Sequence, residues 1–295
     1  MSDVRFDHRL QLRGAGWGVG EAPGKAILLG EHFVVHGAPA LAVPVGGRRV
    51  RVSIAPGRGA WRVAPEATLH VRAMVSALGL DPDGVDLSVE SDLPIGSGLG
   101  SSAALAVALV RAAGVTDVEA VRAHAHALEH LAHGSPSGVD DAVVSHGCPI
   151  WFEAGVLTPL PTPHRLPLWV AVTPSGPPTR EAVAAVSRWK DAHPADFAEL
   201  LAEAHRDAHV ARDAVRDGDW GALGAAMNRA HVRLAILGVS TPAIEEVCRS
   251  ARAAGALGAK LTGAGLGGAV LVLTSKALDL GGGLGQGACT ECFPA

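Results

Sequence analysis

Short apolar runs and alternating segments, broken by glycine and proline, open the chain. Between about residues 16 and 52, runs such as KAILLG and VRV are typical of strands joined by turns. Residues 66–79 follow a helical pattern, and the segment GVDLSVESDLP that begins at Gly84 predicts a strand. The N-terminal third therefore predicts mainly strands, with one helix.

The middle of the chain has a helical pattern. Residues 101–113 form an alanine-rich run without breakers, and residues 117–133 predict a second helix that Asp117 starts. The Pro-Ser-Gly sequence at 136–138 ends this helix, and a further element is expected to begin near Asp140.

Prolines cluster at residues 159–168 (PLPTPHRLPL) and mark the best candidate for a domain boundary. Beyond them, Ser240 or Thr241 can cap a helix with Pro242 in its first turn, ending near Gly255. The other elements expected here are a strand at 169–173 and helices at about 179–190, 194–217 and 219–236. Two blocks of mixed strands and helices predict an α+β protein with domains at 1–165 and 166–295 and the site between them.

Composition narrows the function classes. Of the 295 residues, 48% are hydrophobic and 18% charged, as in a packed globular protein, and the net charge of −4 favours neither nucleic acid nor an anionic membrane as a partner. No apolar run reaches the roughly 18–20 residues that span a bilayer, and the charged start MSDVRFDHRLQLRG lacks the apolar core of a signal peptide. We therefore expect a cytoplasmic protein.

The cysteines point to no particular chemistry. Four of them in a chain of this length do not make a disulfide framework. Cys289 and Cys292 form a Cys-x-x-Cys pair, but neither a second pair nor a βαβ context accompanies it. A metal or redox role for this pair is therefore not favoured.

A glycine-rich segment, DLPIGSGLGSSAA from Asp92, runs directly into the alanine-rich helix. Such a loop presents unpaired backbone N–H groups beside the positive end of a helix dipole, where phosphates bind. Ser101 and Ser102, at the start of the helix, can cap it or ligate Mg²⁺. The simpler alternative is an ordinary N-cap that follows a flexible loop.

Two better-known nucleotide signatures do not apply. The Walker A pattern fails around Gly24-Lys25, because Val19 and Ala26 stand where glycine and Ser/Thr are required. A G-x-G-x-x-G pattern occurs at Gly263, Gly265 and Gly268. It is expected to follow a helix and precede a strand, which is the reverse of the dinucleotide-binding order.

Charged residues near these loops could carry the chemistry. Glu129 lies on a predicted helix, and Asp140 follows the Pro-Ser-Gly turn. One of these carboxylates could hold Mg²⁺ while the other accepts the proton of the acceptor. Lys25, Glu31 and His32 cluster in EAPGKAILLGEHFVVHG, where a lysine could neutralise a transferring phosphoryl group. Taken one by one, such acids and such a lysine are more often ordinary surface charges.

Together the segments resemble the GHMP small-molecule kinases, and within that family the mevalonate kinases. Three family motifs occur in order over nearly the whole chain: APGKAILLGEHFVVHG, PIGSGLGSSAA and KLTGAGLGG. The segments EHFVVHG, SPSGVD and LGVSTP favour the mevalonate kinases over galactokinases and homoserine kinases. The resemblance implies a two-domain α+β fold: an N-terminal domain like ribosomal protein S5 domain 2 and a ferredoxin-like C-terminal domain.

The resemblance also implies the reaction, in which Mg-ATP phosphorylates the 5-hydroxyl of mevalonate. Asp140 matches the catalytic aspartate that accepts or orients the hydroxyl proton, and Lys25 matches the lysine near that aspartate and the substrate. Ser102 and Glu129 match the pair that ligates Mg²⁺.

Binding residues follow from the same comparison. Glu31 and His32 match positions that line the acceptor pocket, and Thr179 resembles part of a segment that closes over the substrate. The residues matching the phosphate-binding segments are Gly96, Ser97, Gly98, Leu99, Gly100, Ser101 and Ser102, with Gly263 and Gly265.

Two positions depart from the family pattern. Leu266 interrupts the usual glycine run of the third motif, so a changed loop path is expected there. Asp141 adds a second acid after Asp140, and we expect it to point away from the site. The alternatives are a relative that phosphorylates phosphomevalonate or another small hydroxylated acceptor, and a non-catalytic ligand-binding member of the fold. A homodimer is possible.

Overall fold

The computed structural model describes residues 18–93, 97–133, 138–174, 176–177, 179–276 and 290–291. These residues form two compact units that interleave along the sequence. The first unit comprises 18–22, 49–92 and 102–146, and the second comprises 23–48, 93–101 and the described residues from 147 onward. The two long strands β1 (Val19–Leu29) and β2 (Ala40–Pro56) contribute residues to both units.

The first unit combines a small sheet with helices. Strand β4 (Val85–Ser91) pairs antiparallel with residues 50–56 of β2, and β3 (Trp61–Arg62) pairs parallel with β4. A 3₁₀ turn, η2 (Pro65–Ala67), leads into α1 (Thr68–Ala77), and α2 (Ser101–Ala112), α3 (Val118–His133) and α4 (Val139–His146) follow. The expected cap of α3 is present, because Oδ1 of Asp117 accepts a hydrogen bond from the Ala120 N–H at 2.8 Å.

One arginine ties the helices of the first unit to its first strand. The Arg111 guanidinium, on α2, donates to the carbonyl oxygen of Glu21 at 2.7 Å and to that of Ser145 at 2.9 Å. Burial lowers the pKa of Arg111. These bonds link β1, α2 and the end of α4.

The second unit contains a four-stranded antiparallel sheet in the order β10-β7-β9-β8. Its strands are β7 (Leu168–Val172), β8 (Gly258–Thr262), β9 (Ala269–Leu273) and β10 (Thr290–Glu291). In the same unit, residues 40–42 of β2 pair with β5 (Ile150–Glu153), which forms a hairpin with β6 (Val156–Pro159). The sequence pattern did not predict β5 and β6.

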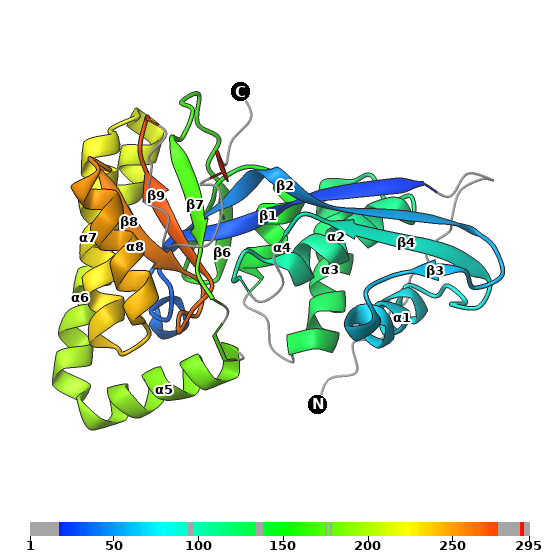
Figure 1. Ribbon diagram of the computed structural model, residues 1–295, viewed down its shortest axis with the longest axis horizontal. Helices are drawn as coiled ribbons and strands as arrows, with labels where there is room; N and C mark the ends of the chain where they lie inside the picture. Colours follow the sequence, from blue (N-terminus) through cyan, green and yellow to red (C-terminus); the bar gives the residue numbers. More distant parts are fainter. Residues whose placement is uncertain are drawn as a thin grey trace. The chain divides into compact units, whose positions relative to one another are not determined.

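Four helices belong to the second unit: α5 (Thr179–Ala192), α6 (Pro194–Asp217), α7 (Trp220–Ile236) and α8 (Pro242–Ala253). Of the two candidate caps of α8, Thr241 is the one used, since its hydroxyl accepts from the Ile244 N–H at 3.3 Å. Helices α7 and α8 cover one face of β8 and β9, with α6 packed on the outer side of α7 (Figure 1). The short turn η1 (Val34–His36) follows β1.

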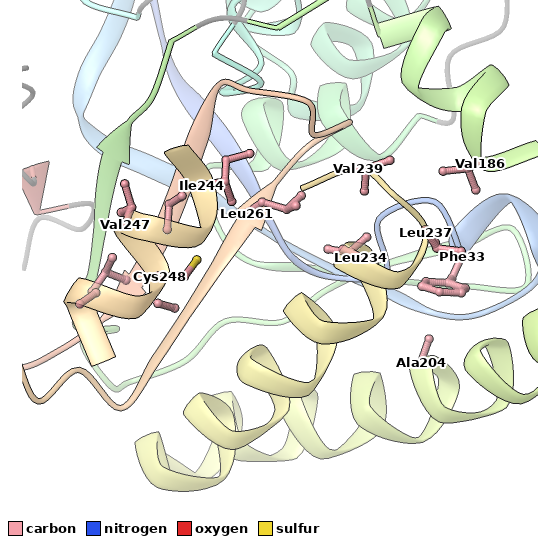
Figure 2. Packing of buried hydrophobic residues seen from close by; sticks show 14 of the residues in the cluster. Phe33, Val186, Ala204, Leu234, Leu237, Val239, Ile244, Val247, Cys248 and Leu261 are labelled. Carbon is pink, nitrogen blue, oxygen red and sulfur yellow. The ribbon is translucent and has the colours of Figure 1, made fainter. Parts of the chain in front are cut away.

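The apolar core of the second unit lies between this sheet and its helices, and Figure 2 shows it from close by. Phe33, which belongs to the first motif, stacks on Phe197 of α6 with ring centroids 5.7 Å apart. The remaining core side chains come mainly from helices α5 to α8, from strands β7, β8 and β9, and from the segment after α7, and include Leu234, Leu237, Ile244, Val247 and Leu261.

One sequence expectation about this region is wrong. The G-x-G-x-x-G segment follows strand β8, not a helix, and connects two antiparallel strands. The five residues of β8 are all buried and lie only a few positions after α8. A strand that short and that close to a helix end is hard to separate from the helix by periodicity. The conclusion that this loop is not a dinucleotide fingerprint is unaffected.

The described helices and strands make an α+β protein, as expected. No helix in the described part of the chain combines the length and the apolar character needed to cross a membrane. The domain boundary expected after residue 165 stays a prediction.

Candidate functional site

Two glycine-rich loops lie against each other in the second unit. One is the loop expected to bind phosphate, residues 97–101, which is called the phosphate loop below, and the other is the third-motif loop, residues 262–268. A β-carbon placed on Gly98 would lie 3.3 Å from the Thr262 carbonyl oxygen. A β-carbon on Gly268 would lie 2.8 Å from the Ser97 carbonyl oxygen. The backbones therefore meet with no room for side chains between them, which joins the second and third sequence motifs.

The first motif reaches the same loop through Lys25, on β1. Its backbone N–H donates to the Leu99 carbonyl oxygen at 2.9 Å. Gly100 has a φ of 72°, and a β-carbon there would lie 2.6 Å from Cγ of Lys25. Because Gly100 has no side chain, it leaves room for the stem of Lys25, and the Lys25 side chain is buried.

The two residues expected to hold the metal are in direct contact in the first unit. The Ser102 hydroxyl, at the start of α2, donates a hydrogen bond to Oε1 of Glu129 on α3 at 2.5 Å. Glu129 is buried, so its carboxylate is largely shielded from solvent. Hydroxyl and carboxylate oxygens are the hard ligands that Mg²⁺ prefers, and the pair fits such an ion by its chemistry.

Asp140 and Asp141 occupy the first turn of α4 in different environments. Asp140 is half-buried, whereas Asp141 is fully buried and its Oδ1 accepts from Nδ1 of His126 at 3.2 Å. Burial raises the pKa of the Asp141 carboxyl; the His126 contact opposes this shift, and the Asp140 charge adds to it. Asp141, the second acid of the pair, is therefore hydrogen-bonded to His126 on α3.

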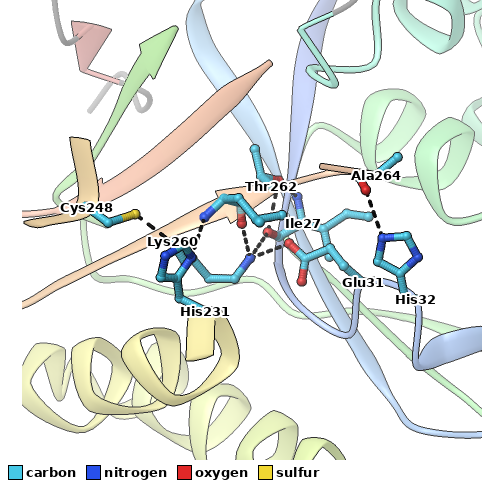
Figure 3. A network of polar contacts seen from close by, with 9 residues as sticks. Ile27, Glu31, His32, His231, Cys248, Lys260, Thr262 and Ala264 are labelled. Carbon is cyan, nitrogen blue, oxygen red and sulfur yellow. Dashed lines mark hydrogen bonds and ion pairs between the residues drawn. The ribbon is translucent and has the colours of Figure 1, made fainter. Parts of the chain in front are cut away.

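A buried ion pair joins Glu31 to Lys260, which precedes the third-motif loop by two positions (Figure 3). The Lys260 ammonium, on β8, donates to Oε1 of Glu31 and to the carbonyl oxygens of Ile27 at 3.3 Å and Leu261 at 2.6 Å. Lys260 is 0% exposed and Glu31 is 3% exposed. Burial raises the pKa of Glu31 and lowers the pKa of Lys260, and their mutual attraction opposes both shifts.

Lys260 is the residue that the sequence analysis missed. Its signal is present in the sequence, because a lysine inside a short strand of apolar neighbours needs a buried partner. The identity of that partner could not be read, since Glu31 is 229 positions away. Glu31, proposed from the motif as part of the acceptor pocket, thus has one carboxylate oxygen engaged by Lys260.

A histidine supports the strand that carries Lys260. Nδ1 of His231, on α7, accepts from the Leu261 N–H at 3.4 Å, so the ring proton is on Nε2, which lies 3.1 Å from the Glu245 carboxylate. Cys248 Sγ is 3.9 Å from Nδ1 (Figure 3). Burial lowers the pKa of His231 and raises that of the Cys248 thiol to about 12.

His32 connects the first motif to the third-motif loop. Its Nε2 lies 2.9 Å from the Ala264 carbonyl oxygen, and because a carbonyl only accepts, Nε2 carries the proton (Figure 3). The residue has a φ of 60°, in the left-handed region that non-glycine residues seldom adopt. Burial lowers the pKa of His32.

The remaining expected site residues lie on α5 and in the third-motif loop, apart from Gly96. Thr179 is the first residue of α5 and is exposed. Gly263 and Gly265 lie in the third-motif loop. Leu266 has a φ of 61°, so its β-carbon does not keep this position out of the left-handed region. Gly96 lies outside the described residues.

The chain is similar to known proteins over most of its length. The family models for the GHMP kinase N-terminal domain and the GHMP kinase C-terminal domain match residues 66–147 and 211–279. The mevalonate kinase of Pyrococcus furiosus is 33% identical over 86% of this chain and 88% of its own length, and that of Aeropyrum pernix is 35% identical over 85% and 87%. The crystal structure of L. major mevalonate kinase in complex with R-mevalonate matches with a TM-score of 0.78 and 30% identity over 88% of each chain.

The matched domains and the three motif segments define an ATP-dependent small-molecule kinase. The chain belongs to the GHMP kinase family.

Proposed function

We propose that this protein transfers the γ-phosphoryl group of Mg-ATP to the 5-hydroxyl of mevalonate, giving 5-phosphomevalonate and ADP. The observation that carries this proposal is the similarity to curated mevalonate kinases, at 33–35% identity over 85–86% of the chain. The similarity to a structure that holds R-mevalonate supports the same acceptor.

The phosphate loop would bind the phosphates of ATP. Backbone N–H groups at the start of α2 suit phosphate oxygens, because the first turn of a helix has N–H groups without intrahelical partners at the positive end of the helix dipole. Lys25, whose backbone is hydrogen-bonded to this loop, would place a positive charge near the transferring group. Gly263 and Gly265 belong to the loop that packs against it.

Ser102 and Glu129 would hold Mg²⁺, which when bound neutralises charge on the ATP phosphates. The Ser102–Glu129 hydrogen bond keeps the two oxygens at 2.5 Å. The hydroxyl and the carboxylate would share the ion through these atoms.

Asp140 would accept the proton of the 5-hydroxyl. As the substrate oxygen bonds to the γ-phosphorus, the bond from that phosphorus to the bridging oxygen of the β-phosphate breaks, and ADP leaves with that electron pair. Glu31, His32 and Thr179 would contact the acceptor. His32 is neutral near pH 7 because burial lowers its pKa, so it would serve through hydrogen bonding and not through charge.

Two alternatives make different demands on the chain. A kinase acting on phosphomevalonate needs cations for the acceptor's phosphate, and the 25 lysines and arginines are not concentrated near the motifs. A non-catalytic member of the fold would not need Lys25, Ser102, Glu129 and Asp140 together. A cytoplasmic location and a homodimer stay predictions.

Release of ADP with a panel of acceptors tests the proposal. We expect turnover with mevalonate and none with phosphomevalonate, galactose or homoserine, because the acceptor contacts come from the mevalonate kinase motifs. Turnover with another acceptor alone would contradict the substrate assignment, and ATP binding without any turnover would support the non-catalytic alternative.

A further inference from the structure

A cluster of three metal-ligating side chains lies on the second unit, on elements other than those that carry the phosphate loop. Glu153 ends strand β5, and His205 and His209 are one turn apart on α6. Nε2 of His209 lies 3.3 Å from Oε1 of Glu153, and Nε2 of His205 lies 3.9 Å from the same atom. One ligand atom from each of the three residues lies within 4.8 Å of the other two.

A hydrogen bond from Trp151 orients the Glu153 carboxylate. Nε1 of Trp151, on the same strand, donates to Oε2 of Glu153 at 3.0 Å, which leaves Oε1 for the histidines. The Trp151 ring also lies against His209, with centroids 5.1 Å apart. A hydrogen bond to the second oxygen of a ligating carboxylate is the outer-shell support that metal sites use to fix their ligands.

Arg212 is a positively charged residue near the cluster. The Arg212 guanidinium lies 5.0 Å from the centre of the Trp151 ring, and its Nε donates to Asp213 at 3.0 Å. This guanidinium stacks on the indole and is paired with an acid. All three candidate ligands are partly exposed, so an ion can reach them from solvent.

We propose that Glu153, His205 and His209 form a binding site for a divalent transition metal of the Zn²⁺ type. Two imidazole nitrogens and one carboxylate oxygen are a ligand set that Zn²⁺ takes, with water in the fourth position. Ligands about 2.0–2.1 Å from a tetrahedral ion are roughly 3.3 Å apart. The two histidine–carboxylate separations of 3.3 and 3.9 Å lie close to this value, and the two histidine nitrogens, within 4.8 Å of each other, would approach by side-chain rotation.

This site differs in chemistry from the Ser102–Glu129 pair. Oxygen-only ligands suit Mg²⁺, whereas imidazole ligands select transition metals. The competing interpretation is that the two histidines only form weak surface ion pairs with Glu153, a type of contact that contributes little to stability. Metal titration separates the two.

The experiment is calorimetric titration of ZnCl₂ into the full-length chain, prepared without an affinity tag and stripped of metal with EDTA. The titration is made in a Cys289→Ser, Cys292→Ser background, so that the cysteine pair cannot bind the ion. The test variants are His205→Asn with His209→Asn, Glu153→Gln, and Trp151→Phe. His193→Asn, which changes a histidine outside the cluster, is the matched control.

We expect one Zn²⁺ per chain, unchanged binding in the control, and loss of the binding step in the double histidine variant. Glu153→Gln should weaken affinity more than tenfold, and Trp151→Phe about tenfold, because an outer-shell partner typically contributes a factor of about 10–100. Absent binding in the parent protein, or equal binding in the double histidine variant, would overturn the proposal. Neither result depends on kinase activity.

Discussion

The buried Lys260–Glu31 pair gives a sharp prediction about stability. In Lys260→Met, the ammonium is replaced by an apolar side chain of similar length, and the Glu31 carboxylate remains enclosed without its partner. Removing one member of a buried pair typically costs about 3–5 kcal/mol. We therefore expect the free energy of unfolding to fall by about 3–5 kcal/mol.

The double variant Glu31→Gln with Lys260→Met separates two effects of Lys260→Met: the unpaired charge left on Glu31, and the loss of the other contacts that the lysine makes. Because the amide carries no charge to leave unpaired, the double variant should recover part of the loss. The matched control is Arg249→Met, which removes an exposed partner of Glu246 at 2.5 Å. An exposed pair contributes about 0–1 kcal/mol, so this change should be small.

The assay is urea unfolding followed by both tryptophan fluorescence and circular dichroism, because coincident transitions establish that the chain unfolds in one step. A loss below about 1 kcal/mol in Lys260→Met, or a double variant no more stable than the sum of its two single changes, would refute the reasoning. Either result would mean that the pair is solvated.

Three further predictions concern the metal, the pH dependence and the third-motif loop. Glu129→Gln should raise the Mg²⁺ concentration needed for half-maximal activity; an unchanged Mg²⁺ titration would remove Glu129 from the metal site. Because burial lowers the pKa of His231, this residue contributes stability above the unfolded value of 6.5 that is lost as pH falls below it. His231→Asn should therefore show a smaller loss of unfolding free energy between pH 7.5 and 5.5 than the wild type, and an equal loss would contradict the assignment. Gly267→Ala should lower the free energy of unfolding by more than about 2 kcal/mol, since the new β-carbon would lie 2.5 Å from the Pro174 carbonyl oxygen. Leu266→Gly should change the free energy of unfolding by less than about 1 kcal/mol, because the backbone of Leu266 is already in the left-handed region. Equal unfolding midpoints for these two variants would contradict the loop geometry.

Local signals in the sequence were sufficient for most helices. Asp117 and Thr241 cap the helices that their positions predicted, since an N-cap depends only on the next three residues. The signal for the glycine-rich loop was equally local, because the glycines and the helix that follows them are contiguous, and its binding of phosphate stays a prediction. The hairpin of β5 and β6 was not predicted, since strands of four residues offer too few positions to show alternation.

The contacts that build the site are not local, and this limits what a sequence pattern can give. Lys260 is one of four lysines in the sequence, and nothing in the residues around it shows that Glu31 lies against it in the fold. The same holds for the cluster of Glu153, His205 and His209, where only the spacing of the two histidines is visible in the sequence. Family resemblance supplied the roles of Asp140 and Lys25, and these roles stay predictions.

The measurement that tests the central claim most directly is formation of 5-phosphomevalonate from mevalonate and Mg-ATP, followed by phosphorus NMR. It compares the wild type with Asp140→Asn and with Asp141→Asn, the neighbouring acid that hydrogen-bonds to His126. The account predicts one phosphomevalonate per ADP, a loss of about 10²–10⁴-fold in Asp140→Asn with Mg-ATP binding retained, and a change of less than about tenfold in Asp141→Asn. No phosphomevalonate from the wild type, or near wild-type turnover in Asp140→Asn, would contradict it.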